Sequence, residues 1–244
     1  MGREKGTMKA RLQERVLIHG NAIGDAPDAA RRQRIAHIPR AIRDRLRYGL
    51  VLQSVSDVAE RIGIAIVPFY VFEESISDKL DIIAEPGLKP VSGMFLDYAE
   101  IERLCDRPEC EELRLDREKL SGDGCRCFAF KHEGQVVAYM LCNFHECDSR
   151  LLSFHLKQGE VYLTGAFTFP AYRGKGLAAA LECELYQHLN RMGYRRYHSI
   201  NLLFNAPGLR FKKKLRSRPS EFRLYVSLFS RYRRNLTLRA YSNP

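Results

Sequence analysis

The stretch TFPAYRGKGLAAAL, residues 168–181, combines residue types that could hold a phosphate group. Pro170 cannot donate to a β-ladder, so a strand that reaches it is expected to end there. Gly174 and Gly176 permit backbone angles that are closed to other residues, and they place no side chain in the way of a ligand. Residues 177–181 favour a helix. The first N–H groups of such a helix lack a partner inside it and lie at the positive end of its dipole. Strand, glycine turn and helix N-terminus together predict an anion site.

Two basic side chains support this prediction, and two common phosphate motifs do not fit. Arg173 and Lys175 bring positive charge to the expected turn. The stretch lacks GxxxxGK[ST], and it does not continue as GxGxxG because Ala179 stands where the third glycine would be. On these residues alone, a plain tight turn before a helix remains the alternative.

The rest of the sequence predicts the elements that would position this turn. Strands are expected where β-rich or alternating patterns occur, and helices where apolar residues recur at helical spacing. The expected strands are 64–74, 91–98, a hairpin within 125–146 that turns at 132–134, 159–169, 196–205 and 221–232. The expected helices are pieces of 9–48, then 54–63, 97–106, 110–124, 176–193 and a short one after 205–208. This order predicts an α/β (α+β) fold with a mixed sheet.

Prolines and charge divide the chain further. Pro68 places the first strand at a sheet edge or splits it, and the two prolines and one glycine of 84–90 predict a connector. We therefore expect a basic helical extension with a β-segment at 1–88 and a domain at 89–244. The extension is expected to lie beside the acceptor site or to form a homodimer surface.

The net charge of +11 is uneven, and it proposes partners without choosing among them. Residues 1–48 hold 12 Lys/Arg against 5 Asp/Glu, residues 49–190 hold 14 against 23, and residues 191–244 hold 14 against 1. The basic ends could meet nucleic acid, an anionic membrane or an anionic co-substrate. The sequence has no recognisable nucleic-acid motif, and nucleic acid is the less favoured partner. The basic amphipathic segment 28–48 could contact an anionic membrane, although covering a neighbouring apolar surface is the commoner use.

The cysteines and the N-terminus indicate a reducing compartment. Seven cysteines make an odd count without a CxxC pair, so free thiols and a cytoplasmic location are expected. Cys125 and Cys127 alternate and should share one face of a strand. No metal site is expected, because His145 and Cys147 alone are too few ligands for zinc. The N-terminus lacks the apolar core of a secretory signal.

The turn and its flanks resemble the GNAT superfamily of acyl-CoA-dependent N-acyltransferases. Residues 173–178, RGKGLA, match the R/Q-x-x-G-x-[GA] acyl-CoA motif, and FTFPAYR resembles the lead-in to it. Asn205, Gly208 and Phe211 fit the family pattern N-x-x-[AS]-x-x-[FL], with Gly in place of Ala or Ser. The resemblance extends over about 89–232 and implies a mixed, mostly antiparallel central sheet flanked by helices.

The resemblance implies an acetyl-CoA or other acyl-CoA co-substrate. Its diphosphate would bind the turn, and its pantetheine arm would pair with the preceding strand as an added β-strand. The cofactor-binding residues implied are Phe167, Thr168, Phe169, Arg173, Gly174, Lys175, Gly176, Leu177, Ala178, Asn205, Phe211 and Lys212. Lys212 departs from the family, which often has at this position a Tyr that protonates the departing thiolate.

Candidates for the catalytic base lie on and before the strand that leads to the turn. Glu160 and Tyr162 lie on one face of the strand before the motif, as i and i+2. Counting back along that strand from Arg173 places Tyr162 at the position that histone acetyltransferases of this family use for the base, with Glu160 one step further along the same face. His145 and Glu146 end the preceding strand and could act as the base through water. Asn205 is a further candidate catalytic residue, without a role as the base.

The sequence thus predicts an acyltransferase that moves an acetyl or other short acyl group from acyl-CoA to an amine. An association with proteins of surface-polysaccharide biosynthesis suggests an amino sugar or another small metabolite as acceptor. The alternative is a basic nucleic-acid-binding or membrane-peripheral protein on a GNAT-like scaffold.

Overall fold

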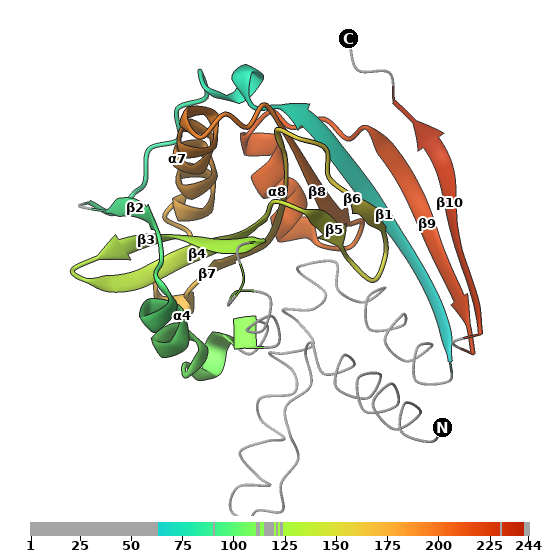
Figure 1. Cartoon of the computed structure of the whole chain (residues 1–244), viewed down its shortest axis with the longest axis horizontal. Helices are drawn as coiled ribbons and strands as arrows, with labels where there is room; N and C mark the ends of the chain where they lie inside the picture. Colours follow the sequence, from blue (N-terminus) through green and yellow to red (C-terminus); the bar gives the residue numbers. More distant parts are fainter. Residues whose placement is uncertain are drawn as a thin grey trace, which may run out of the picture.

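A computed structural model gives the fold, and it describes residues 63–241 apart from 90, 111, 112, 115–119, 121, 123 and 230. The strands in this part are β1 Ile64–Ser75, β2 Ser92–Phe95, β3 Cys125–His132, β4 Gln135–Asn143, β5 Glu146–Asp148, β6 Ser153–His155, β7 Glu160–Thr168, β8 Arg196–Leu202, β9 Glu221–Leu228 and β10 Tyr232–Ala240. The α-helices in this part are α4 Tyr98–Cys105, α7 Leu177–Arg191 and α8 Ala206–Lys214. Figure 1 shows their arrangement.

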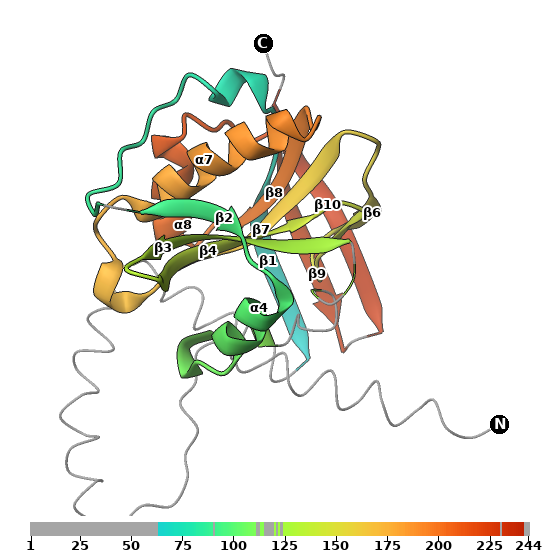
Figure 2. The same ribbon diagram turned by 60° about the vertical axis from the view of Figure 1, so that its left-hand side comes forward.

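Eight of these strands form one sheet in the order β10-β9-β1-β8-β7-β4-β3-β2, and β5 pairs with β6 in a separate hairpin. The β7–β8 pair is parallel, and the other neighbouring strands of the sheet run antiparallel. Helices α7 and α8 cover one face, and α4 lies on the other (Figure 2). The predicted mixed, mostly antiparallel sheet flanked by helices is confirmed for the described residues.

Most of the predicted elements of residues 91–215 are present with shifted ends. The hairpin turns at Glu133-Gly134, where φ is positive at both residues, as a tight turn of matching twist requires. Cys125 and Cys127 are buried in one cluster, and α4 buries Ile101, Leu104 and Cys105 as its spacing predicted. Helix α8 begins earlier than expected, at Ala206, because Asn205 caps it by accepting a hydrogen bond from Gly208 N–H.

The position of β1 corrects the prediction for Pro68. Strand β1 is continuous and lies inside the sheet, between β9 and β8. Part of the expected segment 1–88 therefore belongs to the same sheet as residues of 89–244. Its pairing with β8 begins only at Phe69, opposite Leu202, and the Pro68 carbonyl accepts a hydrogen bond from Leu203 N–H at the strand end. The missing N–H of Pro68 therefore faces the end of the β8 ladder, where its loss removes no strand pair.

The C-terminal region also differs from its prediction. The strand expected at 221–232 is two strands, β9 and β10, joined by a turn that contains Phe229 at a φ of 48°. Much of the basic C-terminal region thus belongs to the sheet, and β10 is its edge. The helices expected within 9–48 and at 54–63 lie outside the described residues, apart from Gly63, and so does most of the segment 110–124.

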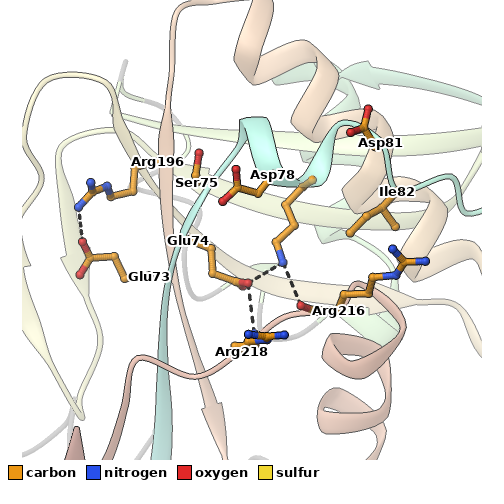
Figure 3. A pocket seen from close by; sticks show the side chains of 10 residues that line it. Glu73, Glu74, Ser75, Asp78, Asp81, Ile82, Arg196, Arg216 and Arg218 are labelled. Atoms are coloured by element: carbon orange, nitrogen blue, oxygen red, sulfur yellow. Dashed lines mark hydrogen bonds and ion pairs between the residues drawn. The ribbon is translucent and has the colours of Figure 1, made fainter. Parts of the chain in front are cut away.

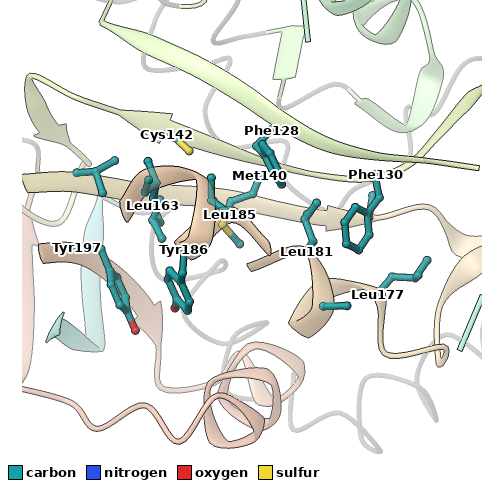
Figure 4. Packing of buried hydrophobic residues seen from close by; sticks show 14 of the residues in the cluster. Phe128, Phe130, Met140, Cys142, Leu163, Leu177, Leu181, Leu185, Tyr186 and Tyr197 are labelled. Atoms are coloured by element: carbon teal, nitrogen blue, oxygen red, sulfur yellow. The ribbon is translucent and has the colours of Figure 1, made fainter. Parts of the chain in front are cut away.

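The main core lies between the sheet and α7, where Leu177, Leu181 and Leu185 recur at helical spacing (Figure 4). Leu189 continues the same spacing. It also contains a charged pair. Glu182 of α7 is fully buried and accepts hydrogen bonds from Lys212 Nζ of α8, at 2.9 Å, and from the Tyr186 hydroxyl. A buried pair of this kind stabilises little over apolar residues, but the loss of one partner leaves an isolated charge.

We predict that Lys212→Met destabilises the protein by about 3–5 kcal/mol, because Glu182 would remain buried without its counter-charge. The measurement is urea unfolding of the single variants and of Lys212→Met with Glu182→Gln. The double variant should recover most of the loss. Additive single effects would show that the two side chains are not coupled.

Candidate active site

The predicted turn before α7 offers unoccupied backbone donors. Gly174 and Gly176 have φ values of 80° and 72°, conformations that favour glycine. The first helical hydrogen bond runs from Ala180 N–H to Gly176 O, and the N–H groups of residues 174–178 have no acceptor among the described residues. A Cβ placed on Gly174 would meet nothing within 4 Å, so the turn is open on that side. This arrangement suits the diphosphate of an acyl-CoA.

Neighbouring segments hold the turn in this shape. Gly87 N–H donates to Lys175 O at 2.7 Å, which directs that carbonyl towards the 84–89 segment. Arg173 Nε donates to Thr168 O at 3.1 Å, and its guanidinium lies 5.8 Å from the Phe167 ring. Arg173 is exposed, so it closes the turn while its remaining N–H groups face solvent.

Strand β7 has one open edge along its second half. Its parallel pairing with β8 ends at Tyr162 opposite His198, after three residue pairs. From there β7 continues beside β4, whereas β8 continues beside β1 (Figure 1). Gly165 and Ala166 are exposed although topology makes β7 an interior strand. The two strands therefore separate and leave backbone groups of β7 available to an added strand.

A register shift in the same place turns β7 and orients the donor before the turn. The shift lies opposite the β4 segment 139–141, and Gly165 has a φ of 61°. Beyond it, Phe169 N–H donates to Val137 O of β4. Because donors alternate along an antiparallel strand, Thr168 N–H points away from β4, towards the open edge. A backbone donor that faces an open edge in this way can stabilise an oxyanion.

The carboxylate of Glu160 lies at the closed end of the separation, on the face opposite α7. Its Oε2 accepts from Lys157 N–H at 3.0 Å and lies 3.3 Å from His198 Nε2 of β8. The His198 ring packs against Phe154 of the β5–β6 hairpin. Burial raises the pKa of Glu160, but Lys157 N–H and His198 together lower it by more, so the pKa lies below its ordinary value. Glu160 is therefore a carboxylate at neutral pH.

Comparison with known proteins identifies the family. The sequence profile of the Acetyltransferase (GNAT) family matches residues 94–215. The chain belongs to the GNAT acetyltransferase family. A comparison with curated proteins gives no match.

Solved structures resemble the chain at low identity. A functionally unknown conserved protein from Staphylococcus epidermidis is 8% identical, with 70% of this chain and 65% of that chain covered and a TM-score of 0.49. A GCN5-related N-acetyltransferase from Kribbella flavida is 13% identical, with 70% and 62% covered and a TM-score of 0.45. AAC(6')-Iy in complex with a bisubstrate analogue is 17% identical, with 52% and 90% covered and a TM-score of 0.40. This chain thus spans just under two thirds of the first two proteins.

The remaining GNAT motif residues lie around α8. Asn205 uses its Oδ1 to cap the helix, at 3.0 Å from Gly208 N. Phe211 packs against the core under α7. Lys212 is buried and paired with Glu182, and its Nζ lies within 5.6 Å of the Phe72, Tyr197 and Phe211 ring centroids. Its ammonium group is therefore engaged inside the fold by Glu182, and a contact of Lys212 with coenzyme A stays a prediction.

The other base candidates are less well placed than Glu160. Tyr162 is buried against the β5 region, and burial raises the pKa of its hydroxyl further above neutrality. His145 is exposed, and its ring lies against Gly124. His198 was not predicted from the sequence, because a histidine inside an expected strand carries no signal until its partner on the neighbouring strand is known.

A charged hollow of about 530 Å³ lies elsewhere, where the end of β1 meets the segment after α8 (Figure 3). Its two glutamates are already paired. Glu73 pairs with Arg196 at 2.5 Å, and Glu74 accepts from Lys79 and from Arg218 N–H. Lys79 also donates to the Leu215 and Arg216 carbonyls at the end of α8. These contacts join β1 to α8, and the GNAT motif residues lie outside this hollow.

Within the described residues, neither a metal-binding cluster nor a helix that could cross a membrane is present.

We predict that Glu160 contributes stability that depends on pH. A carboxyl whose pKa is lowered on folding stabilises the protein above its unfolded pKa, and this contribution is lost as pH falls through the lowered folded pKa. As pH falls from about 6 to about 3, the free energy of unfolding of Glu160→Gln should therefore decrease less than that of the wild type. Urea unfolding across this range measures it. An unchanged pH dependence in Glu160→Gln would contradict the assignment.

Proposed function

We propose that this protein transfers an acetyl group from acetyl-CoA to an amine by direct attack on the thioester. The observation that carries the proposal is the set of unpaired N–H groups at residues 174–178, next to an open strand edge. Family membership supports it, because members of the GNAT family use acyl-CoA. The open edge of β7 suits the amide-bearing pantetheine arm, which would pair as an added strand.

In the proposed reaction, the amine nitrogen forms a bond to the thioester carbon and the carbon–sulfur bond breaks, with its electron pair going to sulfur. Glu160, directly or through water, accepts the proton that the amine loses. Thr168 N–H donates to the carbonyl oxygen as negative charge develops there. The proton reaches the thiolate through solvent, since an alkyl thiolate, like that of cysteine with its pKa of about 8.5, is protonated at neutral pH. The acceptor remains open, and an amino sugar is the first one to test.

We predict that acetyl-CoA binds in a calorimetric titration, and that Arg173→Ala weakens binding about tenfold by loss of charge and of the Thr168 contact. Arg191→Ala is the matched control, because Arg191 is an exposed arginine at the other end of α7. It should bind as the wild type does. Absence of binding at millimolar acetyl-CoA would refute the function, and equal losses in both variants would refute the site.

We predict that Glu160→Gln lowers kcat about 100-fold with little change in KM for acetyl-CoA, because the base acts only in the chemical step. The assay follows the free thiol of coenzyme A, with a panel of primary amines that includes amino sugars. Glu146→Gln is tested beside it, since Glu146 of β5 is the alternative carboxylate base. A loss of kcat in Glu146→Gln but not in Glu160→Gln would assign the base to Glu146 instead.

A further inference from the structure

Strand β8 carries buried polar side chains on the face towards the helices, at the point where it leaves β7. Ser199 is the first residue after the last β7–β8 pair, and it is 3% exposed. Its side chain lies on the same face as Tyr197, which stacks on Tyr186 of α7. Asn201, next on this face, is also buried and packs against the first turn of α8 at Gly208.

The Ser199 hydroxyl has no hydrogen-bond partner among the described residues. A buried hydroxyl without a partner costs free energy, so an interior strand normally carries an apolar side chain or a satisfied polar one there. Ser227, the comparable serine of β9, is also buried, but its hydroxyl is not orphaned in this way. The Ser199 hydroxyl is therefore free to donate to a bound ligand.

Its position suggests which part of the ligand it meets. On the proposed function, the diphosphate lies at 174–178 and the pantetheine arm follows the open edge of β7 towards the closed end of the separation. The thioester is then at that end, where Leu163 and Ser199 follow the last β7–β8 pair, Tyr162 with His198. Glu160 lies on the opposite face of the sheet, so the acceptor and the sulfur approach from different sides.

We propose that Ser199 Oγ–H donates a hydrogen bond to the sulfur of the leaving thiolate. The family often uses a tyrosine to protonate this sulfur, but this chain has Lys212 at the position of that tyrosine, and Glu182 holds Lys212. Ser199 keeps its own proton. It stabilises the thiolate while the electron pair of the broken carbon–sulfur bond resides there, and the thiolate takes its proton from solvent. This role rests on the proposed function, because it requires bound coenzyme A.

The test needs no acceptor. Coenzyme A and desulfo-coenzyme A, which lacks the sulfur, are titrated calorimetrically into wild type, Ser199→Ala and the control Ser227→Ala at about pH 7 and pH 9. A hydrogen bond to a charged acceptor is the stronger kind, so the wild-type preference for coenzyme A should rise to about tenfold at the higher pH, where more of the thiol is ionised. In Ser199→Ala this preference should fall to about one, with desulfo-coenzyme A bound as in wild type.

Ser227→Ala should keep the wild-type preference. Ser199→Ala should also unfold at the same temperature as wild type or higher, since it removes an unsatisfied hydroxyl. A wild-type preference retained in Ser199→Ala at both pH values would overturn the role of Ser199 and leave the proposed function intact. Failure of the wild type to bind either compound would instead refute the proposed function and this role with it.

Discussion

The site depends on a parallel strand pair that stops early. Strands β7 and β8 share three residue pairs, and then each follows a different neighbour, β4 or β1. Backbone groups inside a sheet are normally all paired, so such a separation is stable only where other elements hold the strands apart. The register shift at Gly165 turns β7, and the full-length β1 keeps β8 in the sheet. The result is an open edge that leads to the first turn of α7.

The helices above this edge are joined by charge as well as by apolar packing. Glu182 and Lys212 connect α7 to α8, and Lys79 connects the end of α8 to Glu74 of β1. These pairs are buried, so breaking one costs more than forming it gains. They fix α8 relative to the first turn of α7. They also account for Lys212 at a position where the family often has a tyrosine.

Much of this was accessible from the sequence, because local rules govern it. The glycine turn, the alanine-rich helix and the hairpin at Glu133-Gly134 follow from backbone preferences and periodicity. The central place of β1 could not be predicted, because Pro68 indicates an edge unless the end of the neighbouring ladder is known. Likewise, Glu160 was predicted as a candidate, but His198 and Ser199 gain meaning only through the pairing of β7 with β8. Long-range strand pairing is what the sequence pattern leaves undetermined.

Amide hydrogen exchange with and without acetyl-CoA tests the central claim most directly, because it reads the backbone donors themselves. The account predicts that the amides of residues 174–178 and of Thr168 become protected when acetyl-CoA is present, while those of the distant edge strand β10 do not change. Binding of acetyl-CoA that left the 174–178 amides exchanging as in the free protein would contradict it.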